Sequence, residues 1–196
     1  AMSAHDGGIA VMVKTPGLSP VKTRLAAVLG RQRAEALYLA CADAVIEQVL
    51  ALERLSGVRA YWAPAEENPV AQAFWSDRAA LPMLDQGEGE LGARMARVHA
   101  ALQRAHGFGL LVGADIPQVE VATLLTAVDV LRGIGPRQVL GMAEDGGFWL
   151  YGANRSPPEA LWSSVTYGAA RTGAEFKLTL AAYGPWSNAA QLHDLD

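Results

Sequence analysis

The 196-residue chain contains a single cysteine, Cys41, which lies in an apolar stretch. One thiol excludes an intrachain disulfide and a zinc site built from several cysteines. The first residues also lack the positively charged start and apolar core of a signal peptide. We therefore expect a protein of a reducing compartment, the cytoplasm.

The chain also lacks the features of membrane proteins and nucleic-acid-binding proteins. No run approaches the roughly 20 apolar residues that a membrane span needs. The net charge is -4, so there is no overall excess of lysine and arginine to attract a polyanion. We expect no membrane and no nucleic-acid partner, and any basic site must be local.

Several common catalytic motifs are absent as well. The four histidines, His5, His99, His106 and His193, do not have the paired spacing of a zinc site. The chain has no G-x-S-x-G elbow, and no G-x-G-x-x-G follows the first apolar run, which argues against a serine hydrolase and a dinucleotide oxidoreductase. Residues 17–23, GLSPVKT, lack the second glycine of a Walker loop and are one residue too short for it. Transfer chemistry remains.

The apolar residues, 51% of the chain, recur in patterns typical of alternating strands and helices. The patterns predict strands at residues 8–13, 58–62, 81–84, 108–112, 138–142 and 148–151, and helices at 23–55 (in two pieces), 70–75, 91–106, 119–131 and 172–182. This alternation predicts an α/β domain with a mostly parallel sheet that helices cover on both faces. We expect one domain over residues 8–196, after a disordered segment 1–7 whose Ala1 comes from an expression tag.

A basic loop, residues 14–24, joins the first predicted strand to the first predicted helix. It carries three cations, Lys14, Lys22 and Arg24, on a path stiffened by prolines and a glycine. Ligands of such sheets bind at the carboxyl ends of strands, and a helix start favours phosphate. The loop is therefore predicted to bind a di- or triphosphate; the alternative is a solvated surface loop.

Two further segments follow predicted strands and carry carboxylates. Asp115 comes directly after the apolar run 108–112, where it could hold Mg²⁺ or Mn²⁺ or could cap the next helix. Glu144 and Asp145, followed by two glycines, could accept hydrogen bonds from a sugar or act as a base, or could form an ordinary hairpin turn. The tail offers Asp194 and Asp196 as a second metal ligand or as part of a disordered end.

Four ordered motifs carry a resemblance to a known family. Residues 14–25, 91–95, 113–117 and 144–148 together resemble the bacterial GT-A-type transferases known as arsenosugar-biosynthesis glycosyltransferases. More distantly, the first and third motifs are similar to molybdenum-cofactor and phospholactate guanylyltransferases. The resemblance implies the three-layer α/β/α, Rossmann-like GT-A fold of nucleotide-diphospho-sugar transferases. One departure is that Asp115 stands alone where glycosyltransferases of this fold have an Asp-x-Asp motif.

The resemblance also implies roles for individual residues. It implies catalytic roles for Lys22, Glu144 and Asp145, and a metal site of Asp115 and Asp196 for Mg²⁺ or Mn²⁺. It places the nucleotide on Lys14, Thr15, Pro16, Gly17, Lys22 and Arg24, and the substrate on Gly146, Gly147 and Phe148. The function predicted first is glycosyl transfer from a nucleotide-sugar to a small-molecule acceptor. The alternatives are nucleotidyl transfer from an NTP with release of pyrophosphate, and a non-catalytic nucleotide-binding protein.

Overall fold

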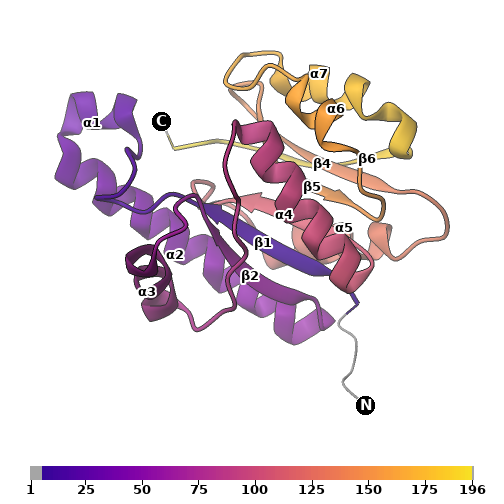
Figure 1. Ribbon diagram of the computed structural model, residues 1–196, viewed down its shortest axis with the longest axis horizontal. Helices are drawn as coiled ribbons and strands as arrows, with labels where there is room; N and C mark the ends of the chain where they lie inside the picture. The colour runs from indigo at the N-terminus through magenta and orange to yellow at the C-terminus, as the bar shows by residue number, and fades with distance from the viewer. Residues whose placement is uncertain (1–5, 196) are drawn as a thin grey trace.

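Short apolar runs form the strands of an open sheet in the computed structural model, which describes residues 6–195. The sheet has the order β2-β1-β3-β5-β4-β6 (Figure 1). Neighbouring strands are parallel except for β5, which is antiparallel to both β3 and β4. The strands are β1 Gly8–Val13, β2 Arg59–Pro64, β3 Gly109–Gly113, β4 Gln138–Ala143, β5 Phe148–Ala153 and β6 Trp186–Leu192.

Helices pack on both faces of this sheet and make a three-layer α/β/α fold, as the sequence predicts. One core cluster joins the sheet to α2, α3 and α5, and a second joins it to α4, α6 and α7. The helices are α1 Thr23–Leu29, α2 Arg31–Ser56, α3 Pro69–Arg78, α4 Leu91–His106, α5 Val121–Leu131, α6 Glu159–Ser163 and α7 Thr172–Thr179, followed by the 3-10 turn η1 Ala181–Tyr183.

The alternation of side chains along β1 explains why the sheet has two buried faces. Ile9, Val11 and Val13 belong to the cluster on the α2 and α5 side, and Ala10 belongs to the opposite cluster. Successive residues of a strand point to opposite faces, so a continuous apolar run buries both. Helix α1 differs from the other helices, because it has no buried residue and extends beyond the sheet next to the start of α2 (Figure 1).

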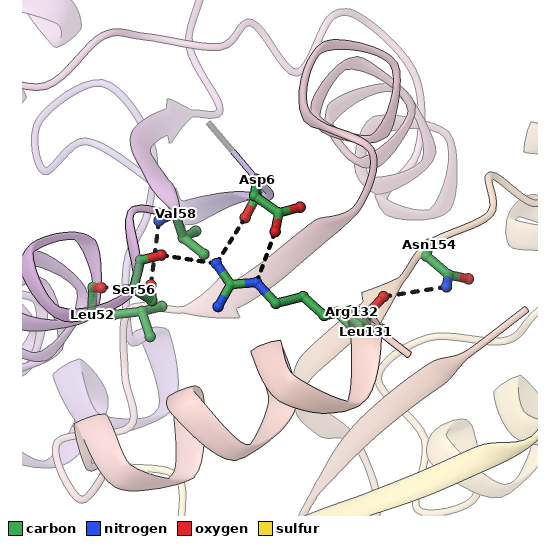
Figure 2. Close-up of polar contacts among 7 residues, drawn as sticks. All are labelled: Asp6, Leu52, Ser56, Val58, Leu131, Arg132 and Asn154. Carbon is green, nitrogen blue, oxygen red and sulfur yellow. Dashed lines mark hydrogen bonds and ion pairs between the residues drawn. The ribbon is translucent and has the colours of Figure 1, made fainter. Parts of the chain in front are cut away.

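The ends of three segments meet at the amino end of β1. Arg132, after α5, donates from Nε to Asp6 Oδ2 at 3.0 Å and from Nη2 to the Ser56 carbonyl at 2.8 Å (Figure 2). The hydroxyl oxygen of Ser56, the last residue of α2, accepts from Val58 N–H at 3.3 Å. These contacts lie at the opposite end of the sheet from the carboxyl ends of the parallel strands. They therefore stabilise the fold and do not take part in ligand binding at the carboxyl ends.

Most predicted elements are confirmed, and the exceptions have local causes. Residues 81–84 form only a single bridge, between Met83 and Trp62, instead of a strand. Leu91, an apolar residue of the predicted helix 91–106, is 49% exposed because it occupies the first position of α4, beyond the edge of the core. Strand β6 and helix α6 were not predicted; β6 has small and polar residues and lies at the edge of the sheet.

Two residues of the expected disordered N-terminus have defined contacts. Asp6 binds Arg132, and Gly7 N–H donates to the His106 carbonyl at 2.9 Å. Residues 1–5, with Ala1, lie outside the described residues. Within residues 6–195, no helix is both long enough and apolar enough to cross a membrane.

Candidate functional site

An open cleft of about 590 Å³ lies at the carboxyl ends of β1 and β3. These strands are parallel neighbours, so the loops that follow them meet at one edge of the sheet. The cleft is therefore where the sequence predicts ligand binding. It is lined by Met12, Val13, Lys14, Pro20, Val21, Lys22, Thr23, Arg24, Leu25, Tyr38, Ala65, Gln86, Leu91, Gly113, Ala114 and Asp115.

The first part of the basic loop is anchored to the protein interior through Thr15. The Thr15 hydroxyl is buried, donates to Glu66 Oε2 at 2.7 Å and accepts from the Trp75 indole N–H at 2.9 Å. The Thr15 amide donates to Glu66 Oε1 at 2.9 Å. Thr15 therefore holds the loop in place and faces away from the cleft, and neither Pro16 nor Gly17 is among the lining residues.

The three predicted cations all line the cleft, but they differ in exposure and in ion pairing. Lys22 pairs with Asp115, with 2.8 Å between Nζ and Oδ2 and only 12% of the Lys22 side chain exposed. Lys14 and Arg24 are exposed, and neither forms an ion pair with any residue in the range 6–195. Lys14 and Arg24 thus remain available for an anionic ligand, whereas Lys22 is already paired with Asp115.

Lys22 has an uncommon backbone conformation. Its φ of 46° and ψ of 51° are left-handed, and it is the one non-glycine residue with positive φ among residues 6–195. Such a conformation costs of order 1–2 kcal/mol for an L-residue and is found preferentially at functional sites. Here it turns the chain into α1 while Lys22 Nζ reaches Asp115, 93 positions further along.

Asp115 is not the cap of the helix that follows it. Helix α5 starts at Val121 with Glu120 at its N-cap position, so the capping alternative for Asp115 is wrong. The Asp115 side chain is instead 36% exposed at the cleft and bound by Lys22. Its carbonyl accepts from Leu195 N–H at 3.3 Å, which brings the C-terminal tail to the same place.

The tail adds a further carboxylate, Asp194, to this edge of the sheet. Burial raises the pKa of Asp194 to about 7, helped by the charges of Asp115 and Asp145 and by a hydrogen bond with Asp145, while Lys22 acts in the opposite direction. Burial disfavours the charged form of a carboxyl, and neighbouring carboxylates add to this effect. Asp196, the residue predicted as a metal ligand, lies outside the described residues.

The turn after β4 lies beside the cleft, yet none of its residues is a lining residue. Glu144 N–H donates to the Leu192 carbonyl at 3.0 Å, and Glu144 Oε2 lies 2.7 Å from His193 Nδ1. Asp145 Oδ1 accepts from Gly147 N–H at 2.8 Å, as in a hairpin turn. The hairpin alternative is therefore confirmed for this segment, and a functional role of Glu144 and Asp145 stays a prediction.

Gly146, Gly147 and Phe148, which are predicted to bind the substrate, make their contacts with other residues of the protein. A Cβ on Gly146 would lie 1.8 Å from the Ala170 carbonyl oxygen, so the close approach that this glycine permits is made by the chain's own backbone. The Phe148 ring packs against Phe176 with centroids 4.5 Å apart. This turn is supported on the α7 side by Ala170 and Phe176.

Some cleft residues were not predicted. Tyr38 of α2 accepts the Lys14 amide N–H at 2.9 Å, and burial raises the pKa of its hydroxyl. Gln86 donates from Nε2 to the Ala63 carbonyl at 2.7 Å. Gln86 follows a strand-like run and lies beside a glycine, so the strand-end rule could have found it; nothing local distinguishes Tyr38 from a core residue.

The residues present fit a divalent cation in charge, although they do not form a complete ligand shell. Within residues 6–195, no three histidine, cysteine, aspartate or glutamate side chains are grouped as a ready-made metal site. Mg²⁺, however, is often held by one or two carboxylates together with substrate phosphates and water. The crowded carboxylates of Asp115, Asp145 and Asp194 are compatible with that mode.

Comparison with solved structures defines the class of this fold. A crystal structure provisionally named a nucleotide-diphospho-sugar transferase, from Desulfovibrio desulfuricans G20, has a TM-score of 0.82 and 22% identity over 97% of this chain and 82% of the other. CMP:2-keto-3-deoxy-manno-octonic acid synthetase complexed with CTP has a TM-score of 0.54 and 13% identity, covering 94% and 90%. 4-Diphosphocytidyl-2C-methyl-D-erythritol synthase from Anaerococcus prevotii DSM 20548 has a TM-score of 0.53 and 8% identity, covering 97% and 90%. The chain has the fold shared by these transferases.

The family of the chain follows from its sequence. Residues 45–169 match the family described as "Uncharacterized protein conserved in bacteria (DUF2064)", and the chain belongs to this family. The matched range includes Asp115 and the turn after β4, while the basic loop precedes it. A comparison with curated protein sequences yields no match.

Proposed function

We propose that this protein is a metal-dependent glycosyltransferase that uses a nucleotide-diphospho-sugar donor and a small-molecule acceptor. The observation that carries the proposal is the contact between Lys22 and Asp115 inside the cleft. It joins a cation that can bind a diphosphate to a carboxylate that can bind the metal of that diphosphate. The fold, shared with transferases, supports the same conclusion.

The donor diphosphate would lie on the basic loop. Lys14 and Arg24 are exposed at the cleft and lack acidic partners among the described residues, so their charges are available to phosphate oxygens. Lys22, which is paired with Asp115, would neutralise the leaving diphosphate as the sugar–oxygen bond breaks.

Mg²⁺ or Mn²⁺, held by Asp115 and Asp194, would stabilise the negative charge of the departing nucleoside diphosphate. Glu144 or Asp145 would be the base that takes the proton of the acceptor hydroxyl. Asp196 remains a predicted further metal ligand. The specific resemblance to arsenosugar-biosynthesis glycosyltransferases remains a prediction.

The test is isothermal titration with UDP- and GDP-sugars in the presence of Mn²⁺. We expect saturable binding of at least one donor, lost when Mn²⁺ is chelated. The control variant is Arg33→Ala, which removes an exposed arginine on α2 that is not a lining residue, and it should bind the donor as the unaltered protein does. Absence of heat for every nucleotide at millimolar concentration would reject the proposal.

Nucleotidyl transfer is the second candidate, favoured by the fold shared with a synthetase complexed with CTP. In this reaction a phosphorylated acceptor attacks the α-phosphate of an NTP, and pyrophosphate leaves. The basic loop serves both reactions, so the products decide between them. Pyrophosphate released from CTP or GTP supports this candidate, whereas free UDP or GDP released from a sugar donor supports the first.

A non-catalytic nucleotide-binding protein is the third candidate, because the described residues lack a complete metal site. Asp115→Asn separates it from the enzymes. If nucleotide binding persists in this variant and neither protein turns over any donor, the protein is a binder. If the unaltered protein turns over a donor and Asp115→Asn loses more than tenfold of that activity, it is an enzyme.

A further inference from the structure

The C-terminal tail is bonded to two loops of the site at positions on both sides of Asp194. Glu144 N–H donates to the Leu192 carbonyl at 3.0 Å, and Leu195 N–H donates to the Asp115 carbonyl at 3.3 Å. In Figure 1 the tail runs from β6 toward the side of the molecule on which α1 lies. The tail therefore joins the turn after β4 to the loop after β3.

His193 makes two further bonds on the same path. Its amide N–H donates to Gln118 Oε1 at 3.1 Å, and its Nδ1 lies 2.7 Å from Glu144 Oε2. Gln118 belongs to the loop after β3, three residues beyond Asp115. We call the side chains of Gln118, Glu144 and His193 the tail clasp.

Fold stability does not explain the tail clasp. The side chains of His193 and Glu144 are 61% and 53% exposed, so their interaction takes place largely in water. Exposed pairs of this kind contribute only about 0–1 kcal/mol to stability. Its geometric effect is larger, because bonds at residues 192, 193 and 195 hold the backbone on both sides of Asp194 against the loops that carry Asp145 and Asp115.

We propose that Glu144, with Gln118, is a positioning residue that holds the tail through His193 so that Asp194 completes the metal site with Asp115. This inference rests on the proposed function, since it assumes that Asp194 binds the metal. It assigns Glu144 a role different from that of a base. Residues that orient metal ligands commonly change metal affinity 10–100-fold when they are removed.

The experiment measures Mn²⁺ binding to the full chain by electron paramagnetic resonance, with the metal alone and no donor. We expect Glu144→Ala and Gln118→Ala each to weaken Mn²⁺ binding about tenfold, with melting temperatures close to that of the unaltered protein. Glu144→Gln should restore binding, because its amide oxygen still accepts a hydrogen bond from His193. Glu35→Ala, which removes an exposed ion pair with Arg31 on α2, is the matched control and should leave binding unchanged.

Two results would overturn the inference. Mn²⁺ binding by Glu144→Ala equal to that of the unaltered protein shows that the tail clasp does not position a ligand. Glu144→Gln that binds Mn²⁺ normally but has lost turnover as completely as Glu144→Ala shows that Glu144 acts as a base. The proposed function fails in a different experiment, the donor titration, so the two failures can be told apart.

Amide hydrogen exchange gives a readout that needs no metal. The N–H groups of His193 and Leu195 are both bonded to the loop after β3. We expect Gln118→Ala and Glu144→Ala to speed their exchange while the exchange of β1 amides stays unchanged. Unchanged exchange at both tail amides would contradict the inference.

Discussion

At the scale of single residues, Lys22 combines a strained backbone with a buried charge. Its left-handed conformation would be easier for glycine, yet the chain has lysine there, and Nζ reaches Asp115. Strain that the surrounding structure maintains at a ligand edge is typical of functional positions. Substitutions of Lys22 should therefore affect the stability of the protein through the backbone conformation and its function through the loss of the ammonium group.

Lys22→Ala and Lys22→Gly test this separation, because both remove the ammonium and only glycine accepts the backbone conformation. We expect both variants to lose more than tenfold in donor binding and turnover. The free energy of unfolding, measured with urea, should be about 1 kcal/mol higher for Lys22→Gly than for Lys22→Ala. Turnover of Lys22→Ala equal to that of the unaltered protein would show that Lys22 has no role in the reaction.

At the scale of elements, the turn between β4 and β5 depends on packing as well as on conformation. Gly146 has φ of +90°, and its Cα faces the Ala170 carbonyl. Gly173 N–H donates to the Gly146 carbonyl at 2.8 Å, so the first turn of α7 is bonded to the turn between β4 and β5. A turn that is supported in this way can hold Asp145 in a fixed place.

Gly146→Ala should destabilise the protein more than the same change at a glycine with open space. Gly168→Ala is the matched control, because Gly168 has φ of +75° and nothing within 4 Å of an added Cβ. We expect Gly168→Ala to cost about 1 kcal/mol from backbone strain alone. Gly146→Ala should cost about 1–3 kcal/mol more, from overlap with Ala170. Equal midpoints in urea denaturation would contradict this packing.

Most elements could be predicted because their signals are local. The run at residues 8–13 and the break at Gly30 between α1 and α2 follow from composition and period within a few residues. Strand β6 has no such signal, because its small and polar residues become a strand only through pairing with β4. The substrate role of Gly146 and Phe148 remains without structural support, since their contacts come from Ala170 and Phe176, which are distant in sequence.

At the scale of the whole molecule, a buried histidine links stability to pH. His99 of α4 is fully buried, and its Nε2 lies 3.2 Å from the Ala153 carbonyl of β5. Burial lowers the pKa of His99 to about 4, from an ordinary value of 6.5. Between pH 4 and pH 6.5, His99 is therefore mostly neutral in the folded protein and mostly protonated in the unfolded chain.

The contribution of His99 to the stability of the protein should consequently fall as the pH is lowered from about 6.5 to about 4. Between these values the His99 ring binds more protons in the unfolded state than in the folded state, so its contribution to the free energy of unfolding decreases. The decrease due to His99 is of order 3 kcal/mol. His99→Gln is the control, because it retains the carboxyl groups and loses this titration. The prediction fails if urea denaturation gives the same pH dependence for both proteins.

The sequence by itself determined the alternation of strands and helices and the edge at which a ligand should bind, because periodicity and strand-end loops are local properties of the chain. Its four separate motifs indicated the transferase fold. Only the tertiary structure decided that Lys22 and Asp115 meet, that Thr15 faces the interior, and that Asp194 and the tail clasp lie at the same edge. These relations join residues tens of positions apart, and the packing of the sheet sets their distances.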